Sequence, residues 1–230
     1  MNTSDAGAGA RPWLVELVGP AGAGKSTISD AIPLADPTAR DLSLWGLPRR
    51  FLLLSALALL PTLRAAALSR HRLTWEEIAN MIRLGALLRT VRDAMRRGYK
   101  LILIDEGPIF ALSWFEVNGT RNGERWWARW RDRVVSEWGA LLDGIVRVDA
   151  SDPVLARRIR TRPKPHPVKF LAERGVLQFE ASFRQAFDRV VPDFVAARAL
   201  PIRTLRTDGS QVDHSIRQLR RTIEEMQRGN

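Results

Sequence analysis

Short runs of apolar and β-prone residues alternate along the chain with longer segments whose apolar residues recur at helical spacing. The clearest runs occupy 13–18, 101–104, 145–149 and 202–206, and a weaker one occupies 42–45. Near-continuous apolar runs of this length are typical of strands buried on both faces of a parallel sheet. The alternation predicts an α/β fold with a mostly parallel, five-stranded sheet flanked by helices.

Capping residues and prolines mark the expected helix boundaries. Residues 74–77 read Thr-Trp-Glu-Glu, a capping box that predicts a helix start, and Gly98 ends that periodic pattern near Arg97. Proline lacks an N–H donor, so Pro33 and Pro37 are expected to end the first helix and Pro192 to interrupt a later one. The other predicted helices cover 109–118, 124–142, 152–162, 178–199 and 212–226.

The most apolar stretch of the chain is residues 51–60, which read FLLLSALALL and are followed by Pro61. If Pro61 closes this run, it is far shorter than the roughly 20 residues that span a bilayer. The pattern favours a buried helix. An apolar wall for a substrate and a membrane-contacting surface stay open as alternatives.

The helix expected at 124–142 is rich in tryptophan and arginine. Positions 126, 130, 134, 138 and 141 share one face, and three of them are tryptophan. An aromatic stripe at helical spacing indicates a core-facing surface. A basic helix rich in tryptophan also suits a membrane surface, so that interpretation remains an alternative.

Length and composition fit one domain of moderate size, because the chain has 230 residues and 45% are hydrophobic. We expect a disordered tail over 1–11 and a single domain over 12–230. The absence of cysteine excludes disulfides and thiolate metal sites and fits a cytoplasmic location. The formal net charge of +11 comes almost entirely from arginine. It favours solvated helix faces over nucleic acid or an anionic membrane.

One motif carries specific chemistry. Residues 19–26 read GPAGAGKS, which fills every fixed position of the phosphate-binding loop pattern G-x-x-x-x-G-K-[ST] between a predicted strand and a predicted helix. Its glycines let consecutive N–H groups turn inward around an anion, and the following helix points its positive end at the same place. The residues expected at the nucleotide are Gly19, Ala21, Gly22, Ala23, Gly24, Lys25, Ser26 and Thr27.

Two carboxylates follow the apolar run at 101–104. Asp105 and Glu106 are expected beside the phosphate loop, because ligands of parallel sheets bind beyond the carboxyl ends of the strands. Ser26 and Asp105 suit Mg²⁺, with Asp105 acting through water. Glu106 suits a general base that takes a hydroxyl proton.

A dense basic segment follows the fourth strand. Arg157, Arg158, Arg160 and Arg162 fall within six residues. We interpret 157–170 as a lid that closes over a triphosphate, excludes water and neutralises charge on the transferred group. A solvated basic face and a nucleic-acid patch are the alternatives, and no aromatics are interleaved to favour the latter. The three histidines are scattered and show no metal-binding spacing.

The assembled pattern resembles the P-loop kinases, especially the branch of thymidylate kinase and of nucleoside and nucleotide kinases. The resemblance rests on residues 19–27, 101–108, 148–162 and 205–210. It implies that Arg158, Arg160 and Arg162 are lid arginines contacting the transferred phosphoryl group. It also implies that Asp208 and Gly209 lie beside the adenine base. The helices within 34–99 would then face the acceptor.

The chain departs from thymidylate kinases after the third strand. It has Asp105-Glu106-Gly107 where that family carries Asp-Arg-Tyr or Asp-Arg-His, and the Thr-Arg-Glu-Pro stretch is missing. Glu106 is closer to the catalytic glutamate that deoxynucleoside kinases place after the same strand. A carboxylate base suits an alcohol acceptor better than a phosphate acceptor.

These features predict a kinase that uses ATP and Mg²⁺ to phosphorylate a small molecule, such as a nucleoside, a nucleotide, a sugar or another alcohol. An ATP-hydrolysing motor or switch is one alternative, although no Leu-Ser-Gly-Gly or guanine-specific signature is present. A kinase acting on a lipid-linked acceptor at a membrane is another. No nucleic-acid partner is expected, and membrane contact and a homodimer stay open.

Overall fold

The computed structural model describes residues 11–69, 73–119, 125–163, 168–209 and 211–229. All five strands within these ranges are parallel and form one sheet in the order β2-β3-β1-β4-β5. The prediction of a mostly parallel, five-stranded sheet is confirmed. The weak strand begins earlier than expected. The strands are β1 (Trp13–Val18), β2 (Ala39–Ser43), β3 (Leu101–Asp105), β4 (Gly144–Asp149) and β5 (Ile202–Arg206).

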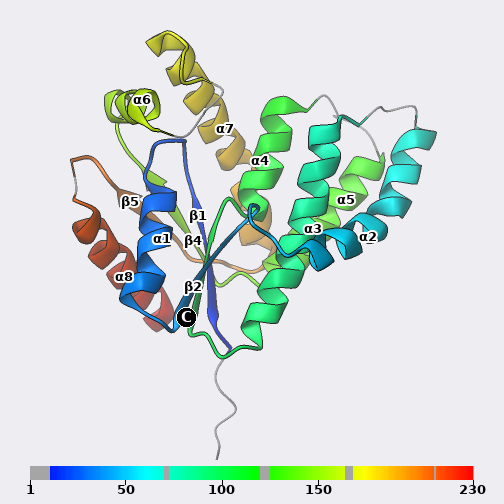
Figure 1. The fold of residues 1–230 in the computed structure, drawn as a ribbon, viewed down its shortest axis with the longest axis horizontal. Coiled ribbons are helices and arrows are strands. Elements are labelled where there is room, and N and C mark those ends of the chain that lie inside the picture. The colour runs from blue at the N-terminus through cyan, green and yellow to red at the C-terminus, as the bar shows by residue number, and fades with distance from the viewer. Residues whose placement is uncertain (1–10, 70–72, 120–124, 164–167, 210, 230) are drawn as a thin grey trace, which may run out of the picture.

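Helices cover both faces of the sheet (Figure 1). Alternate residues of β1 divide the core: Val15 packs in a cluster with α1 and α8, whereas Leu14 packs in a larger cluster with α3, α4, α5 and α7. The helices are α1 (Lys25–Ala35), α2 (Arg49–Leu68), α3 (Trp75–Met95), α4 (Pro108–Asn118), α5 (Arg125–Gly139), α6 (Asp152–Thr161), α7 (Glu173–Ala197) and α8 (Val212–Arg228).

Pro61 and Pro192 lie inside helices, so the predictions that they end or interrupt them are wrong. Pro33 also lies inside α1, but that helix ends at Ala35, between the two prolines expected to end it. Buried side chains on both sides of the proline explain why α7 and α2 continue. Val190 and Phe194 flank Pro192, and Leu59 and Ala66 flank Pro61. Tertiary packing on either side therefore outweighs the lost backbone hydrogen bond.

The favoured interpretation of 51–60 as a buried helix is wrong. In α2 only Ser55, Leu59 and Ala66 are buried, while Leu53 is 67% exposed and Leu57 is 64% exposed. Among the described residues, α2 is also the one helix long and apolar enough to cross a membrane. The helix contacts α3 through a narrow strip of residues, and most of its apolar side chains therefore remain exposed despite its apolar composition.

Other local predictions hold. Thr74 Oγ1 accepts a hydrogen bond from Glu77 N, and a Glu77 carboxylate oxygen accepts one from Thr74 N, which completes the capping box of α3. Trp126, Trp130 and Trp138 are buried in α5, as the aromatic stripe predicts.

The prediction that Arg11 belongs to a disordered tail is wrong, because its guanidinium donates a hydrogen bond to the Asp143 carboxylate.

Glu16 is a fully buried carboxyl group in the middle of β1. Its Oε1 accepts hydrogen bonds from Ile109 N (3.0 Å) and Phe110 N (3.1 Å) at the start of α4. Burial raises the pKa of Glu16 to about 8 despite these donors, and the negative charge of Asp105 adds to the rise. The packing also requires Gly107, since a Cβ there would lie 2.8 Å from Glu16 Cδ.

Glu16 should make stability depend on pH. Its pKa is about 8 in the folded chain and 4.5 in the reference state, so the stability that its protonated form contributes is complete below about pH 4.5. We expect the free energy of unfolding to fall by a few kcal/mol as pH rises from about 4.5 to about 8, and to change little above that.

Glu16→Gln keeps an acceptor oxygen but does not titrate, so the fall should shrink. Urea unfolding followed by circular dichroism between about pH 5 and pH 9 measures it. Glu225→Gln, an exposed change on α8, is the control. An equally steep fall in Glu16→Gln would contradict the assignment.

Candidate active site

The phosphate loop lies between β1 and α1, and its glycines take conformations that other residues avoid. Gly19, Gly22 and Gly24 have φ angles of 149°, 76° and 95°. A Cβ on Gly19 would lie 1.9 Å from the Val148 carbonyl oxygen. The loop therefore depends on glycine for both its turn and its approach to β4. Helix α1 begins at Lys25 and points its amino end into the loop.

Lys25 is held within the loop. Its side chain is buried, and Nζ donates hydrogen bonds to the carbonyl oxygens of Gly19 (2.8 Å) and Pro20 (3.0 Å). An ammonium group in this position adds positive charge to the amide nest. It can exchange these neutral acceptors for phosphate oxygens, which bind it more strongly because they are charged.

Ser26 and Asp105 meet at the carboxyl ends of neighbouring strands. The Ser26 hydroxyl donates to Asp105 Oδ2, and Leu17 of β1 pairs with Asp105 of β3. Asp105 is buried, and within the described structure its Oδ1 has no hydrogen-bond partner. The two residues predicted near Mg²⁺ are therefore in contact, although Asp105, unlike Ser26, is not among the residues that line the cavity described below.

Glu106 lies between β3 and α4 in an unusual conformation. Its φ of 58° is in the left-handed region, where a residue with a side chain is strained. The indole N–H of Trp45 donates to Glu106 Oε2. Burial raises the pKa of Glu106, and the neighbouring charge of Asp105 raises it further. The strain is consistent with a side chain held in place for function.

A cavity of about 1170 Å³ joins these groups. The phosphate loop, Ser26 and Glu106 line one part of it. This volume exceeds the upper end of typical single-ligand pockets, so the cavity has room for more than one small molecule. The remaining wall is rich in aromatic side chains: Trp45, Trp75, Phe110, Trp114, Phe179 and Phe183.

The predicted lid arginines occupy different positions. Arg158 donates to Gly22 O (3.2 Å), Thr207 Oγ1 (3.0 Å) and Thr207 O (2.8 Å), so it ties α6 to the phosphate loop. Arg162 lines the cavity, whereas Arg160 lies 3.5 Å from Glu173 and is not among the lining residues. Residues 164–167 of the proposed lid lie outside the described residues.

Asp208 and Gly209 follow β5. Asp208 Oδ1 accepts a hydrogen bond from Ser151 N (2.6 Å), which lowers the pKa of Asp208. The residue of this loop that lines the cavity is Thr207, whose hydroxyl donates to Ala23 O at 2.8 Å. This hydrogen bond holds the loop after β5 against the phosphate loop. Ala23 itself packs in the core, while its neighbours line the cavity.

Sequence reasoning missed Glu180 on α7. The residue is fully buried, its Oε2 accepts a hydrogen bond from Ala21 N (2.8 Å), and its Oε1 has no partner among the described residues. Burial raises the pKa of Glu180 to about 7. One signal was present: Glu180 is a carboxylate beside the apolar residues Val176 and Phe183, on the buried face of its helix.

The fold and the phosphate loop define a P-loop nucleoside-triphosphate-binding protein of the α/β class. Residues 14–187 match the sequence model of an AAA domain family, and the chain therefore belongs to that family. No curated protein sequence matches the chain.

Solved structures of P-loop kinases share the fold. Thymidylate kinase from Candida albicans matches with a TM-score of 0.60 and 16% identity, over 94% of this chain and 92% of that one. Deoxyadenosine kinase from M. mycoides, with dCMP and dCDP bound, matches at 0.54 and 15% identity, over 92% and 99%. Shikimate kinase from Bacteroides thetaiotaomicron matches at 0.51 and 16% identity, over 92% and 98%.

Glu180 should make nucleotide affinity depend on pH. With its pKa near 7, the carboxyl group is neutral at about pH 6 and ionised at about pH 8, where its charge opposes bound phosphates. Lys25 and Arg184 favour the ionised form, and Asp149 opposes it. We expect Glu180→Gln to bind ADP several-fold more tightly than the wild type at pH 8 and equally well at pH 6.

Calorimetric titration of both proteins at the two pH values measures this difference. At each pH, the dissociation constant of the wild type is divided by that of Glu180→Gln. Ionisation of the nucleotide affects both proteins equally, so it cancels in this ratio. A ratio that is the same at both pH values would show that Glu180 does not change charge in this range.

Proposed function

We propose that the protein is a kinase that uses ATP and Mg²⁺ to phosphorylate the hydroxyl group of a small, ring-bearing acceptor. The observation that carries this proposal is the position of Glu106. It lies at the end of β3, is held by Trp45, and lines the same cavity as the phosphate loop. Phosphoryl transfer to an alcohol requires a general base and a triphosphate site at the same cavity.

Residues 19–27 would bind the phosphates of ATP through backbone N–H groups. Lys25 would contact the β- and γ-phosphates after leaving the carbonyls of Gly19 and Pro20. Arg158 and Arg162 line the cavity and would neutralise the phosphoryl group in transit. Arg160 would act only if the lid moves, because it now contacts Glu173.

The donor set fits Mg²⁺. Ser26 would supply a hydroxyl oxygen, and Asp105, which would act through water, has a buried carboxylate oxygen without a partner in the described structure. Hard oxygen ligands of this kind, one or two per ion, are typical of magnesium sites that also use substrate phosphates. When bound, the ion neutralises charge on the phosphates.

Glu106 would accept the proton of the acceptor hydroxyl. As the acceptor oxygen forms its bond to the γ-phosphorus, the bond from that phosphorus to the bridging oxygen of ADP breaks. The proton passes to the Glu106 carboxylate. Its raised pKa makes this carboxylate a stronger base than an exposed glutamate, while Trp45 keeps it oriented.

The aromatic wall supports an acceptor with a flat or apolar ring. Phe110, Trp114, Phe179 and Phe183 line the cavity on α4 and α7. On the acceptor side, the lining cation contributed by α3 is Arg83, whose guanidinium lies 4.4 Å from the Trp45 ring centroid. One stacked arginine favours a neutral alcohol over a phosphate acceptor. Nucleosides and other cyclic alcohols have this chemistry.

Turnover of ATP with a panel of acceptors tests the proposal. Nucleosides and cyclic alcohols should raise ADP release well above the rate without acceptor, and the matching monophosphates should not. Rapid ADP release that no acceptor changes would indicate an ATP-hydrolysing protein. Stimulation by monophosphates alone would contradict the role of an alcohol acceptor.

Glu106→Gln should lower kcat by about 100-fold or more, because the amide cannot take the acceptor proton. ATP affinity should stay within about threefold, since the phosphate loop is untouched. Steady-state kinetics and ATP titration separate the two effects. Glu225→Gln on α8 is a matched control with full activity expected, and near-normal turnover of Glu106→Gln would exclude Glu106 as the base.

Trp45→Phe tests the contact that holds Glu106. The hydrogen bond from Trp45 lowers the pKa of Glu106, so its loss should raise that pKa further. Because the base acts when ionised, the acidic limb of the profile of kcat/KM against pH should move to higher pH. A lower kcat with an unmoved limb would indicate that Trp45 only shapes the cavity.

A further inference from the structure

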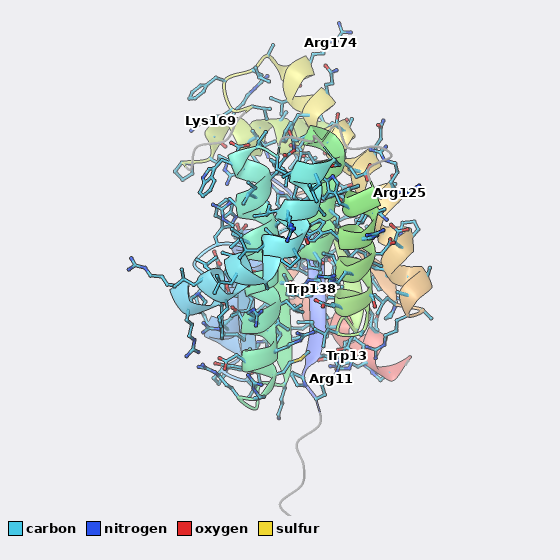
Figure 2. All side chains as sticks on the ribbon, turned by 90° about the vertical axis from the view of Figure 1, so that its right-hand side faces the viewer. Arg11, Trp13, Arg125, Trp138, Lys169 and Arg174 are labelled. Carbon is cyan, nitrogen blue, oxygen red and sulfur yellow. The ribbon has the colours of Figure 1, made fainter. Side chains whose placement is uncertain are left out.

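Helix α2 presents an apolar face that the described residues do not cover. It packs against α3 and α5 along one side, and Figure 2 views the molecule from the side on which α2 lies in front of them. Leu53, Leu57 and Leu60 are each more than half exposed. The exposed residues of this face are Arg49, Arg50, Leu53, Leu54, Leu57, Ala58, Leu60, Pro61, Arg64, Ala67 and Leu68, and we call them the α2 outer face.

The charge of the α2 outer face has a single sign. Arg49, Arg50 and Arg64 are the charged residues of α2, and the helix carries no acidic side chain. The nearby Asp93 of α3 is neutralised by ion pairs with Arg50 (3.9 Å), Arg96 (3.8 Å) and Arg97 (2.5 Å). Leucines flanked by arginines at both ends are the pattern of a helix that lies at a lipid surface.

The next element after α2 along the chain is α3, whose amino end begins at Trp75. This residue is 77% exposed and also lines the cavity. Exposed tryptophan next to leucine and arginine suits the interface between headgroups and acyl chains.

Two occupants fit an exposed apolar helix face: a second copy of this chain and an anionic lipid surface. In a symmetric pair of antiparallel α2 helices, Arg49 and Arg50 of one copy would approach Arg64 of the other, with no acidic partner on either helix. An anionic bilayer complements the same arginines, and the net charge of +11 adds attraction.

We propose that the α2 outer face attaches the protein to an anionic bilayer. The leucines enter the boundary between headgroups and acyl chains, and the arginines pair with lipid phosphates. The helix lies in the membrane plane, since its opposite side packs against α3. This attachment is independent of the catalytic roles proposed above.

The test uses the full chain and sucrose-loaded vesicles of phosphatidylcholine, with or without about one third phosphatidylserine. The wild type should sediment with the anionic vesicles and much less with the neutral ones, and added salt should weaken binding. Leu57→Glu, at an exposed position, should reduce the partition coefficient about tenfold or more. Leu57→Ser should reduce it less, because it adds no charge.

Leu34→Glu is the matched control, because Leu34 is 88% exposed on α1, away from α2. It should bind vesicles as the wild type does. Light scattering after size exclusion identifies the competing occupant. A wild type that stays in the supernatant, an equal loss in Leu34→Glu, or a dimer that Leu57→Glu converts to a monomer would each overturn the proposal.

Discussion

The site depends on the pairing of two adjacent parallel strands. The register that sets Leu17 of β1 against Asp105 of β3 brings the loop after one strand to the acids after the other. A glycine at the end of each strand makes this arrangement possible. Gly19 lets the phosphate loop approach Val148, and Gly107 leaves room for the Glu16 side chain. A shift of this register would separate Ser26 from Asp105, so the chemistry rests on strand pairing before it rests on any side chain.

Two buried carboxyl groups lie close to the anion-binding loop, where a negative charge would weaken the binding of phosphate. Glu16 and Glu180 are both fully buried, and burial raises their pKa values to about 8 and about 7. Glu16 therefore keeps its proton at neutral pH, whereas Glu180 is protonated at about pH 6 and ionised at about pH 8. Among the described residues, the acids that line the cavity are Asp30, Glu76 and Glu106, and burial and the neighbouring charge of Asp105 raise the pKa of Glu106.

The nucleotide side of the molecule could be predicted from sequence because backbone chemistry constrains it. Residues 19–26 and the acids after β3 stand where the patterns place them, since few residues satisfy a left-handed turn or a buried parallel strand. Composition alone misled at 51–60, where an apolar helix proved exposed, and at Pro192, where packing preserved the helix. Glu180 escaped notice because its meaning depends on a contact with Ala21, 159 residues away.

The aromatic wall, where we propose that the acceptor binds, is not marked by any sequence motif. It is assembled from side chains of several helices, with Phe183 stacked 6.1 Å from Phe110 and tilted at 4.9 Å from Phe179. Such contacts tolerate exchange among aromatic and large apolar residues, provided volume is kept. The phosphate loop has no comparable freedom, since its glycines are fixed by backbone geometry. Under the proposed function, the choice of acceptor could therefore change while the phosphate loop stays constant, so the acceptor has to be identified from the shape and charge of the cavity.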